Sequence, residues 1–263
     1  MNTFPTISVI TICFNNLEEL KATLESVDLQ NLKPFEHWII DGSSNNEIKN
    51  YLDSHPQPSY RKWISEKDNG IADAFNKGII RSDGEILNML NSGDYYIDAT
   101  TLETVSQAFQ QQPGISWLHG KYKLLRGGIW VVIGKPFEPG KLYRGMRSVA
   151  HQSMFVKKSL HTKYGLYDTG LNISMDYDFV CRIAKEPFSF LEKPLIVFAP
   201  HGTSQRNYLA AMKQAKIVYE KHNGKSFMLN VWQLRLKALY YLLNGPAGSI
   251  LYKIKVWLKL ENM

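Results

Sequence analysis

The chain has 263 residues, 44% of them hydrophobic and 21% charged, which indicates a globular protein of one large domain or a domain with an appendage. Its apolar runs fall short of the roughly 20 residues that span a membrane, and residues 1–6 lack the basic and apolar regions of a signal peptide. Cys13 and Cys181 lie far apart in apolar segments, which argues against a disulfide framework or a thiolate metal site and fits a reducing cytosol.

The net charge of +7 comes from the C-terminal part of the chain. Basic and acidic residues balance over residues 1–212, whereas residues 213–263 hold nine basic residues against Glu220 and Glu261. Because the rest of the chain has no basic stripe, a nucleic acid is not an expected partner.

In chain order, the first half alternates short apolar, β-branched runs with segments of helical spacing. Strands are predicted over 7–14, 37–40, 63–65 and 86–90, and helices over 18–29, 47–52, 71–80 and 100–111. This alternation predicts right-handed βαβ units and a mostly parallel sheet. Polar loops follow the strands, so Asn15, Asp41, Asp68 and Asp94 are expected along one rim of that sheet.

The second half has a less regular pattern. Irregular strands are predicted over 115–136, with a hairpin turn at Gly127-Gly128. Helices are predicted over 160–164 and 177–185, and a strand over 195–198. From Tyr208 onward the pattern is helical, with breaks at Asn223-Gly224 and Gly245-Pro246.

The most informative stretch is Asn88-Met89-Leu90-Asn91-Ser92-Gly93-Asp94, where an apolar run ends in a turn of small residues. The turn delivers a single carboxylate just past a predicted strand, where open α/β sheets bind ligands. Such a carboxylate can hold a divalent cation that bridges two phosphates. Ser-Gly-Asp is also an ordinary turn, so this segment alone leaves both interpretations open.

Several motifs stand in order around that turn. They are Ser8–Asn15, Ile40–Ser44, Asp68–Gly78, Leu90–Asp94, His151-Gln152 and Met175–Asp178. The series closely resembles the family 2 glycosyltransferases, bacterial enzymes that build polysaccharides with a GT-A fold, and the resemblance covers roughly residues 5–205. It implies an α/β GT-A (nucleotide-diphospho-sugar transferase) domain over 1–207, with a nucleotide-binding half over about 1–98 and an acceptor half over about 99–207. Residues 208–263 are then a basic, aromatic-rich helical extension.

The resemblance implies a set of residues that bind the donor nucleotide. They are Thr11, Phe14, Asn15, Asp41, Asp68, Asp73, Asn76, Lys77, Asn91, Ser92 and Gly93. The family's counterpart of Asp41 binds the nucleotide base, although Asp41 could also stabilise its Gly-Ser-Ser turn, and Asp68 could be a helix cap. Asp73, Asn76 and Lys77 share one helical face, which could equally be a solvated face with an ion pair. Lys77 is expected near the phosphates or near a structural carboxylate.

Asp94 matches the family's metal ligand, which implies bound Mg²⁺ or Mn²⁺. The sequence departs from the family at the preceding position, because Gly93 stands where a second carboxylate is usual. A lone carboxylate is sufficient for these ions when substrate phosphates and water supply the other ligands.

Asp176 matches the family's catalytic base, which takes the proton of the acceptor hydroxyl. Asp176 and Asp178 do not share a helical face, so one can face a cleft while the other caps the helix. His151, Gln152, Arg182 and His201 are further candidates for contacts with the acceptor or the diphosphate. The alternatives are a hydrogen-bonded structural histidine and, for Arg182, an internal ion pair with a carboxylate.

The extension carries apolar and aromatic residues over 227–243. Beyond the Gly245-Pro246 break, Ile250, Ile254, Trp257 and Leu258 recur at helical spacing beside Lys255 and Lys259. A basic amphipathic helix with a tryptophan can lie in an anionic membrane surface. Packing on the catalytic domain, or on a second subunit of a homo-oligomer, explains the same pattern.

Together these features predict an inverting enzyme that moves one sugar from a nucleotide-diphosphate sugar, with UDP favoured, to a hydroxyl of a glycan or lipid-linked glycan in cell-envelope polysaccharide biosynthesis. We expect a cytoplasmic protein. If the C-terminal helices bind lipid, it would lie at the inner face of the cytoplasmic membrane. A nucleotidylyltransferase would need a Gly-rich basic loop after its first strand, where this sequence has Asn15-Asn16-Leu17-Glu18, so that class is disfavoured. A processive synthase would carry a Gln-x-x-Arg-Trp motif and transmembrane helices, and neither is found in this sequence. The alternative that Gly93 keeps open is a non-catalytic nucleotide-sugar-binding or scaffold protein.

Overall fold

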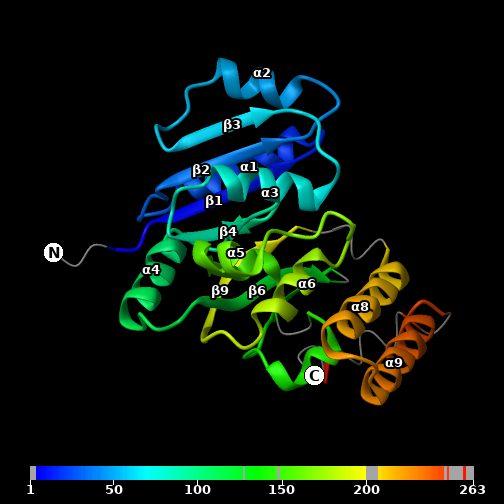
Figure 1. The fold of residues 1–263 in the computed structure, drawn as a ribbon. Coiled ribbons are helices and arrows are strands. Elements are labelled where there is room, and N and C mark those ends of the chain that lie inside the picture. The colour runs from blue at the N-terminus through cyan, green and yellow to red at the C-terminus, as the bar shows by residue number, and fades with distance from the viewer. Residues whose placement is uncertain are drawn as a thin grey trace.

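The first half of the chain forms parallel βαβ units, as the sequence predicts (Figure 1). The computed structural model describes residues 4–126, 128–146, 149–199 and 207–245, together with Gly248, Trp257 and Leu258. The elements of this half are β1 (Ile7–Cys13), α1 (Leu17–Asp28), β2 (Glu36–Asp41), α2 (Glu47–Ser54), β3 (Arg61–Ser65), α3 (Ile71–Arg81) and β4 (Ile86–Met89). The strands pair in the order β3-β2-β1-β4, each parallel to its neighbour. β1 is a nearly continuous apolar run because helices cover both of its faces.

The second half continues the same sheet with mixed strand directions. Its elements are β5 (Tyr95–Tyr96), α4 (Thr101–Gln111), β6 (Trp117–Arg126), β7 (Ile129–Ile133), η1 (Pro139–Arg144), η2 (His151–Ser153), β8 (Met154–Lys157), α5 (Lys158–Tyr164), α6 (Met175–Ile183) and β9 (Phe188–Phe198). β8 is antiparallel to both β4 and β6, and β6 is parallel to β9. In the described residues one sheet therefore runs in the order β3-β2-β1-β4-β8-β6-β9-β5, with β7 beside β6. The first four strands are parallel, as predicted, whereas the second half adds antiparallel pairs beside the parallel pair β6–β9. The β6–β7 hairpin and the 3₁₀ turns before β8 join strands without a crossover helix, which is how antiparallel strands can be connected.

Apolar clusters on the two faces of the sheet hold the helices in place. On one face α3, α5 and α6 pack around Ile10, Phe75 and Phe179, which are almost completely buried. On the other face α1 and α4 pack with Val27 and Phe109 against the strands. Burying each of these side chains contributes about 1.5–3 kcal/mol. The loops at the carboxyl ends of the strands therefore extend from a rigid layer.

Within residues 207–245, two helices follow the sheet, α8 (Tyr208–Asn223) and α9 (Phe227–Leu243), and Figure 1 shows them side by side at one end of the molecule. The predicted break at Asn223-Gly224 is present, since Gly224 has a φ of +75° and Ser226 Oγ caps α9 by accepting from Leu229 N. α8 packs on α6, and α9 packs on η1. The helix predicted around Ile250 and Ile254 lies outside the described residues. None of the helices in the described ranges has both the length and the apolar character needed to cross a membrane.

Candidate active site

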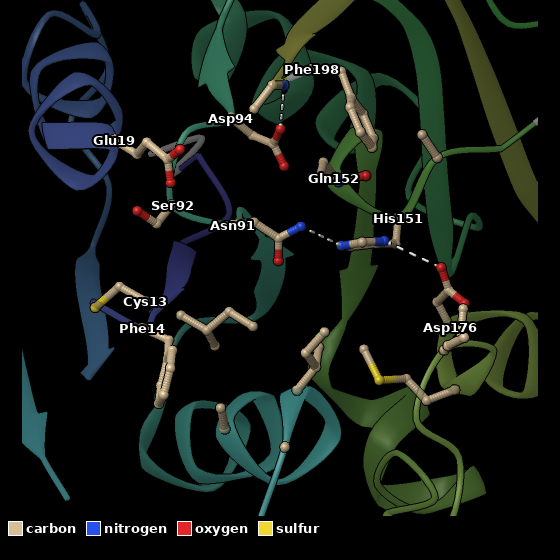
Figure 2. Close-up of a pocket in the computed structure, with 18 of the residues that line it drawn as sticks. Cys13, Phe14, Glu19, Asn91, Ser92, Asp94, His151, Gln152, Asp176 and Phe198 are labelled. Atoms are coloured by element: carbon tan, nitrogen blue, oxygen red, sulfur yellow. Dashed lines mark hydrogen bonds and ion pairs between the residues drawn. The ribbon is translucent and has the colours of Figure 1, made fainter. Parts of the chain in front are cut away.

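A cavity of about 800 Å³ opens at the edge of the sheet where the first parallel strands end (Figure 2). The end of β1, the turn after β4 and the start of α3 line one part of it. Further lining comes from β6, η2, the start of α6 and the end of β9. A crevice outside the carboxyl ends of the strands is where open α/β sheets bind ligands. Its volume is typical of a small-molecule site, for which roughly 300–1,000 Å³ is usual.

Asp94 enters this cavity from the turn after β4. Gly93 makes the turn with a φ of +94° and donates its N–H to Thr23 Oγ1 at 2.8 Å, which fastens the turn to α1. The Asp94 carboxylate is only 2% exposed and accepts a hydrogen bond from Ala199 N at 2.7 Å. Burial raises the pKa of Asp94 to about 6. A buried carboxylate of this kind is stabilised by a positive charge placed beside it.

Asp176 lies in the first turn of α6, beside His151 of η2 in the same cavity (Figure 2). His151 Nδ1 is 3.2 Å from Asp176 Oδ2, and His151 Nε2 is 3.2 Å from Asn91 Nδ2. Because an amide nitrogen can only donate, His151 accepts at Nε2 and donates to Asp176 from Nδ1. The Phe75 ring meets the imidazole edge to face, with the ring centroids 5.9 Å apart. The series Asn91–His151–Asp176 therefore joins residues from both halves of the sheet.

Other residues predicted to bind the nucleotide also line the cavity, namely Phe14, Asp68, Asn91 and Ser92. The Phe14 side chain is 60% exposed, and a ring of this kind can pack on a flat base. Asp68 Oδ1 accepts from Gly70 N at 2.9 Å. Its Oδ2 packs on Gly42, where an added Cβ would lie only 1.8 Å from that oxygen. The glycine at position 42 is therefore required by the position of Asp68.

Asn15 and Asp41 lie at the same rim but hold its loops together. Asn15 has a φ of +53° and exchanges hydrogen bonds with Ser43 and Ser44 of the loop after β2. Asp41 Oδ1 accepts from Ser43 N at 3.0 Å, and its Oδ2 accepts from Ser65 Oγ at 2.7 Å. Neither side chain lines the cavity. The turn-stabilising role that the sequence allowed for Asp41 is therefore present in the structure.

Thr11 and Asn76 are placed away from the nucleotide site that was predicted for them. Thr11 is fully buried within β1, and its Oγ1 is 2.9 Å from His37 Nε2 on the neighbouring strand. Asn76 is buried against Tyr167, donating to its carbonyl and accepting from its N–H, both at 2.9 Å. Both side chains make their hydrogen bonds inside the fold, and neither lines the cavity.

Asp73 and Lys77 also lie outside the cavity lining. Asp73 Oδ2 accepts from Asn69 N at 2.9 Å and so fastens the loop before α3 to the first turn of that helix. Lys77 Nζ is 3.1 Å from Glu66 Oε1 and 3.7 Å from Asp73 Oδ2. Of the two positions considered for Lys77, the structure therefore places it beside structural carboxylates.

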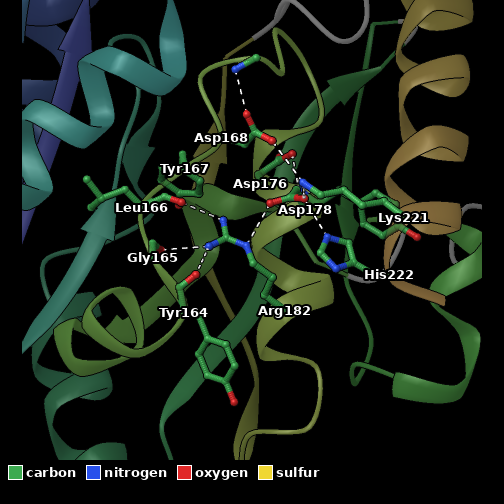
Figure 3. A network of polar contacts seen from close by, with 12 residues as sticks. Tyr164, Gly165, Leu166, Tyr167, Asp168, Asp176, Asp178, Arg182, Lys221 and His222 are labelled. Carbon is green, nitrogen blue, oxygen red and sulfur yellow. Dashed lines mark hydrogen bonds and ion pairs between the residues drawn. The ribbon is translucent and has the colours of Figure 1, made fainter.

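Arg182 belongs to an internal polar network instead of the diphosphate site (Figure 3). Its guanidinium donates to Asp178 Oδ2 at 3.0 Å and to the carbonyls of Tyr164, Gly165 and Leu166. The ion pair that was the alternative for Arg182 is the one that forms. Asp178 also accepts from Lys221 and His222 of α8, so Asp176 faces the cavity while Asp178 fastens two helices.

The two remaining candidates have different outcomes. Gln152 lines the cavity, is 2% exposed, and its backbone carbonyl accepts from Asn88 Nδ2 at 2.9 Å. His201 lies outside the described residues.

Sequence reasoning missed two residues of α1 and the loop before it. Asn16 and Glu19 both line the cavity, and Asn16 Nδ2 donates to Glu19 Oε2 at 2.8 Å. Asn16 immediately follows Asn15 at the end of a predicted strand, so its place at the rim could have been inferred. Glu19 gives no comparable signal, because its position depends on how α1 packs against the turn at Gly93.

The carboxylates of the cavity fit a divalent cation that arrives together with a diphosphate. In the described part of the chain, no three His, Cys, Asp or Glu side chains form a cluster able to hold a metal by themselves. Mg²⁺ and related ions are commonly bound by one or two carboxylates plus substrate phosphates and water. Asp94, buried and with a raised pKa, has the chemistry of such a ligand.

A family model described as glycosyl transferase family 2 matches residues 8–154. The chain belongs to this family. An uncharacterized glycosyltransferase of Mycobacterium tuberculosis is 36% identical over 188 residues, which cover 70% of this chain and 71% of that protein. A PGL/p-HBAD biosynthesis glycosyltransferase of the same species is 25% identical over 186 residues, which cover 70% of this chain and 71% of that protein. The chain is thus a family 2 glycosyltransferase, although Asp176 lies beyond the residues that the family model matches.

Solved structures show the same GT-A-type fold. Staphylococcus aureus TarS 1–349 in complex with UDP-GlcNAc superposes with a TM-score of 0.62 at 14% identity, over 97% of this family 2 chain and 78% of that one. The mannosyltransferase PcManGT from Pyrobaculum calidifontis, in complex with GDP-Man and Mn²⁺, superposes with a TM-score of 0.62 at 15% identity. The match covers 98% of this chain and 81% of that one. A longer TarS structure is covered over only 44% of its length. At these identities the likeness concerns the fold, which is the predicted α/β architecture with a helical extension.

Proposed function

We propose that this glycosyltransferase moves a single sugar, with inversion, from a nucleotide-diphosphate sugar to a hydroxyl of a glycan or lipid-linked glycan in cell-envelope polysaccharide synthesis. The observation that carries the proposal is one cavity lined by both Asp94 and the His151–Asp176 pair. A UDP-sugar is the first donor to test, as in the TarS complex, and a GDP-sugar the second, as in the PcManGT complex.

The reaction needs one base and one leaving group. The oxygen of the acceptor hydroxyl attacks the anomeric carbon as the bond from that carbon to the diphosphate breaks. The nucleotide diphosphate leaves with the electron pair of that bond, and Asp176 takes the hydroxyl proton. A positioned base contributes typically about 10²–10⁴-fold to the rate.

His151 is the positioning residue for Asp176. Its Nδ1–H donates to Oδ2 at 3.2 Å, while the backbone N–H of Tyr177 donates to Oδ1 at 2.7 Å. Together the two contacts fix the position of both carboxylate oxygens. Asn91 in turn fixes the imidazole through its Nε2.

Asp94 would hold Mg²⁺ or Mn²⁺ against the diphosphate, and the cation would neutralise the charge that develops on the leaving group. The residues of the chain supply the rest of the donor site. Phe14 offers a ring for the base and Asp68 a carboxylate oxygen at the start of α3.

The proposal is tested by the release of nucleotide diphosphate from UDP-, GDP- and dTDP-sugars, with Mn²⁺ or Mg²⁺ and mixed cell-envelope glycolipids as acceptors. We expect turnover of one donor that is abolished by Asp94→Ala and Asp176→Asn and kept by Asp53→Asn, which alters an exposed carboxylate of α2. Turnover that survives Asp176→Asn would show that the base is elsewhere. Nucleotide binding without any turnover would favour the non-catalytic, nucleotide-sugar-binding alternative.

We also propose that α9 brings the enzyme to an anionic membrane surface where a lipid-linked acceptor lies. Phe227, Val231, Leu234 and Tyr241 recur at helical spacing on α9 and are 46–79% exposed. Arg235 and Lys237 lie on the same helix. Exposed apolar side chains beside basic ones are typical of helices that bind in the interface of anionic lipid.

Sedimentation with phosphatidylglycerol vesicles tests this attachment. Leu234→Glu should reduce the bound fraction, because it places a charge on the exposed face of α9. Leu29→Glu is the matched control, since Leu29 is 63% exposed on a different surface and Leu234 is 70% exposed. Equal binding of both variants and the parent would contradict the role of α9, and dimerisation lost in Leu234→Glu would favour the subunit-contact alternative.

A further inference from the structure

The turn at Gly93 leaves space for a side chain that comes from α1. The φ of Gly93 is +94°, a conformation that side-chain-bearing residues rarely adopt. A Cβ at this position would lie 3.2 Å from Ala199 Cβ and 3.6 Å from Glu19 Cβ. A carboxylate at position 93 would therefore have to enter space that Ala199 and Glu19 already border.

Glu19 presents its own carboxylate at this place. Glu19 lines the cavity, and Figure 2 shows its carboxylate on the same side of the cavity as that of Asp94. Asn16 Nδ2 donates to Glu19 Oε2 at 2.8 Å, and Asn16 Oδ1 accepts from Phe14 N at 3.1 Å. Because Asn16 is itself held by the backbone after β1, it orients one oxygen of Glu19, as residues behind a metal ligand commonly do.

The same part of the cavity contains buried polar atoms that lack a partner within the described residues. Ser92 Oγ, on the turn between Asn91 and Gly93, makes no hydrogen bond there. Gln152 is 2% exposed and lines the cavity, and its Oε1 is likewise without a partner. Buried polar atoms are normally satisfied, so these atoms indicate that a polar ligand completes this side of the cavity.

We propose that Glu19 supplies the second carboxylate for the divalent cation held by Asp94, in place of a side chain at position 93. This inference rests on the proposed function, because the cation is the one that accompanies the donor diphosphate. Two carboxylates, with phosphate oxygens and water, complete a donor set suited to Mg²⁺ or Mn²⁺. The second carboxylate would then come from the first turn of α1, whereas in the family it usually comes from the loop after β4, at position 93.

Glu18 offers a matched control on the same helical turn. It carries the same charge one residue earlier, is absent from the cavity lining, and pairs with Lys21 at 2.7 Å on the surface. A general loss of negative charge near the site would affect Glu18→Gln and Glu19→Gln alike. A ligand role is specific to Glu19.

The test is Mn²⁺ binding measured by the loss of the free-ion EPR signal, with UDP and separately with GDP present. We expect Glu19→Gln to weaken Mn²⁺ binding at least about tenfold, Glu19→Asp to weaken it less, and Glu18→Gln to leave it unchanged. Asp94→Asn should abolish it. Thermal unfolding should be the same for Glu18→Gln and Glu19→Gln, since both side chains are exposed.

The outcomes separate this inference from the function on which it rests. Mn²⁺ binding that depends on Asp94 but is identical in Glu19→Gln and Glu18→Gln would overturn the role of Glu19 alone. Parent protein that binds the nucleotide but no Mn²⁺ would overturn the metal dependence and the role of Glu19 together.

Discussion

Gly42 shows how a single missing side chain can shape the donor site. A Cβ at this position would lie 1.8 Å from Asp68 Oδ2, the mobile end of a side chain. We expect Gly42→Ala to change the free energy of unfolding little, because Asp68 can rotate away. Nucleotide binding should weaken about tenfold to a hundredfold, the worth of one hydrogen bond to a charged group.

Calorimetric titration with UDP or GDP measures this effect. Gly114→Ala is the control, since Gly114 is exposed and an added Cβ would meet nothing within 4 Å. Unchanged affinity in Gly42→Ala would show that Asp68 does not contact the nucleotide.

His151 allows positioning to be separated from binding. Removing its Nδ1–H leaves Asp176 Oδ2 without that donor, so His151→Leu should lower kcat by roughly tenfold to a hundredfold, part of the contribution of a positioned base. The KM for the donor should stay the same. His151→Gln can still donate from its amide and should lose less. Equal losses in kcat for both variants, or a rise in KM alone, would contradict a positioning role.

At the scale of elements, Asp178 fastens α8 to α6 (Figure 3). Burial alone would raise the pKa of Asp178, but hydrogen bonds from His222 and Lys221 and the charge of Arg182 outweigh it and hold that pKa below its usual range. Asp178 is buried and Arg182 partly buried, so Asp178→Asn removes the counter-charge of Arg182 and should lower the free energy of unfolding by roughly 3 kcal/mol. Urea unfolding measures this loss.

A surface pair provides the comparison for Asp178. Asp53→Asn breaks an exposed ion pair with Lys49 on α2, and solvent screens such pairs, so no measurable loss is expected. If Asp178→Asn is as stable as Asp53→Asn, α8 is held mainly by its apolar contacts.

The same scale shows which parts of the fold the sequence predicts. β1, α1, α3 and α4 have long apolar patterns with a clear period, and their boundaries agree with the structure to within about two residues. β5 and β8 are two and four residues long, too short to carry a period, and their pairing depends on partners far away in the chain. The strand directions and pairing of the second half could therefore not be predicted from the local sequence pattern.

The site divides in a similar way. Among the motif residues on loops after strands, Asp68 and Asp94 line the cavity, whereas Asn15 holds the neighbouring loops together. Thr11, Asn76 and Arg182 lie inside strands or helices, where packing decides which way a side chain faces, and they make their contacts within the fold instead of lining the cavity. Glu19 was missed because only the packing of α1 on the Gly93 turn brings it to the site.

For the whole molecule, buried histidines make stability depend on pH. Burial lowers the pKa of His161 to about 4 and that of His119 to about 3. Below about pH 6.5 these histidines bind protons in the unfolded chain but not in the folded protein. The free energy of unfolding therefore falls as the pH decreases from about 6.5 toward the lowered pKa values. Each histidine should contribute up to about 1.4 kcal/mol per pH unit of this loss.

His119→Leu tests the prediction by urea unfolding between pH 7 and pH 5. His119 lies within a stack of rings that includes Trp117, and its two nitrogens lack hydrogen-bond partners in the described residues. In His119→Leu the free energy of unfolding should change less with pH than in the parent. His55→Gln, at an exposed position, should show the same change with pH as the parent. An unaltered slope in His119→Leu would show that other groups govern the acid sensitivity.

The continuity of the sheet has a consequence for how substrates enter and leave. β4, from the half that carries Asp94, is hydrogen-bonded to β8, and β8 to β6, so no hinge can form between the two halves without breaking that ladder. We therefore expect Asp94, on the turn after β4, and Asp176, in the first turn of α6, to keep their separation when substrates bind. We expect substrates to enter and leave through movements of the loops around the cavity. Variants that slow these loops should lengthen the time the product stays bound, and the chemical step should keep its rate.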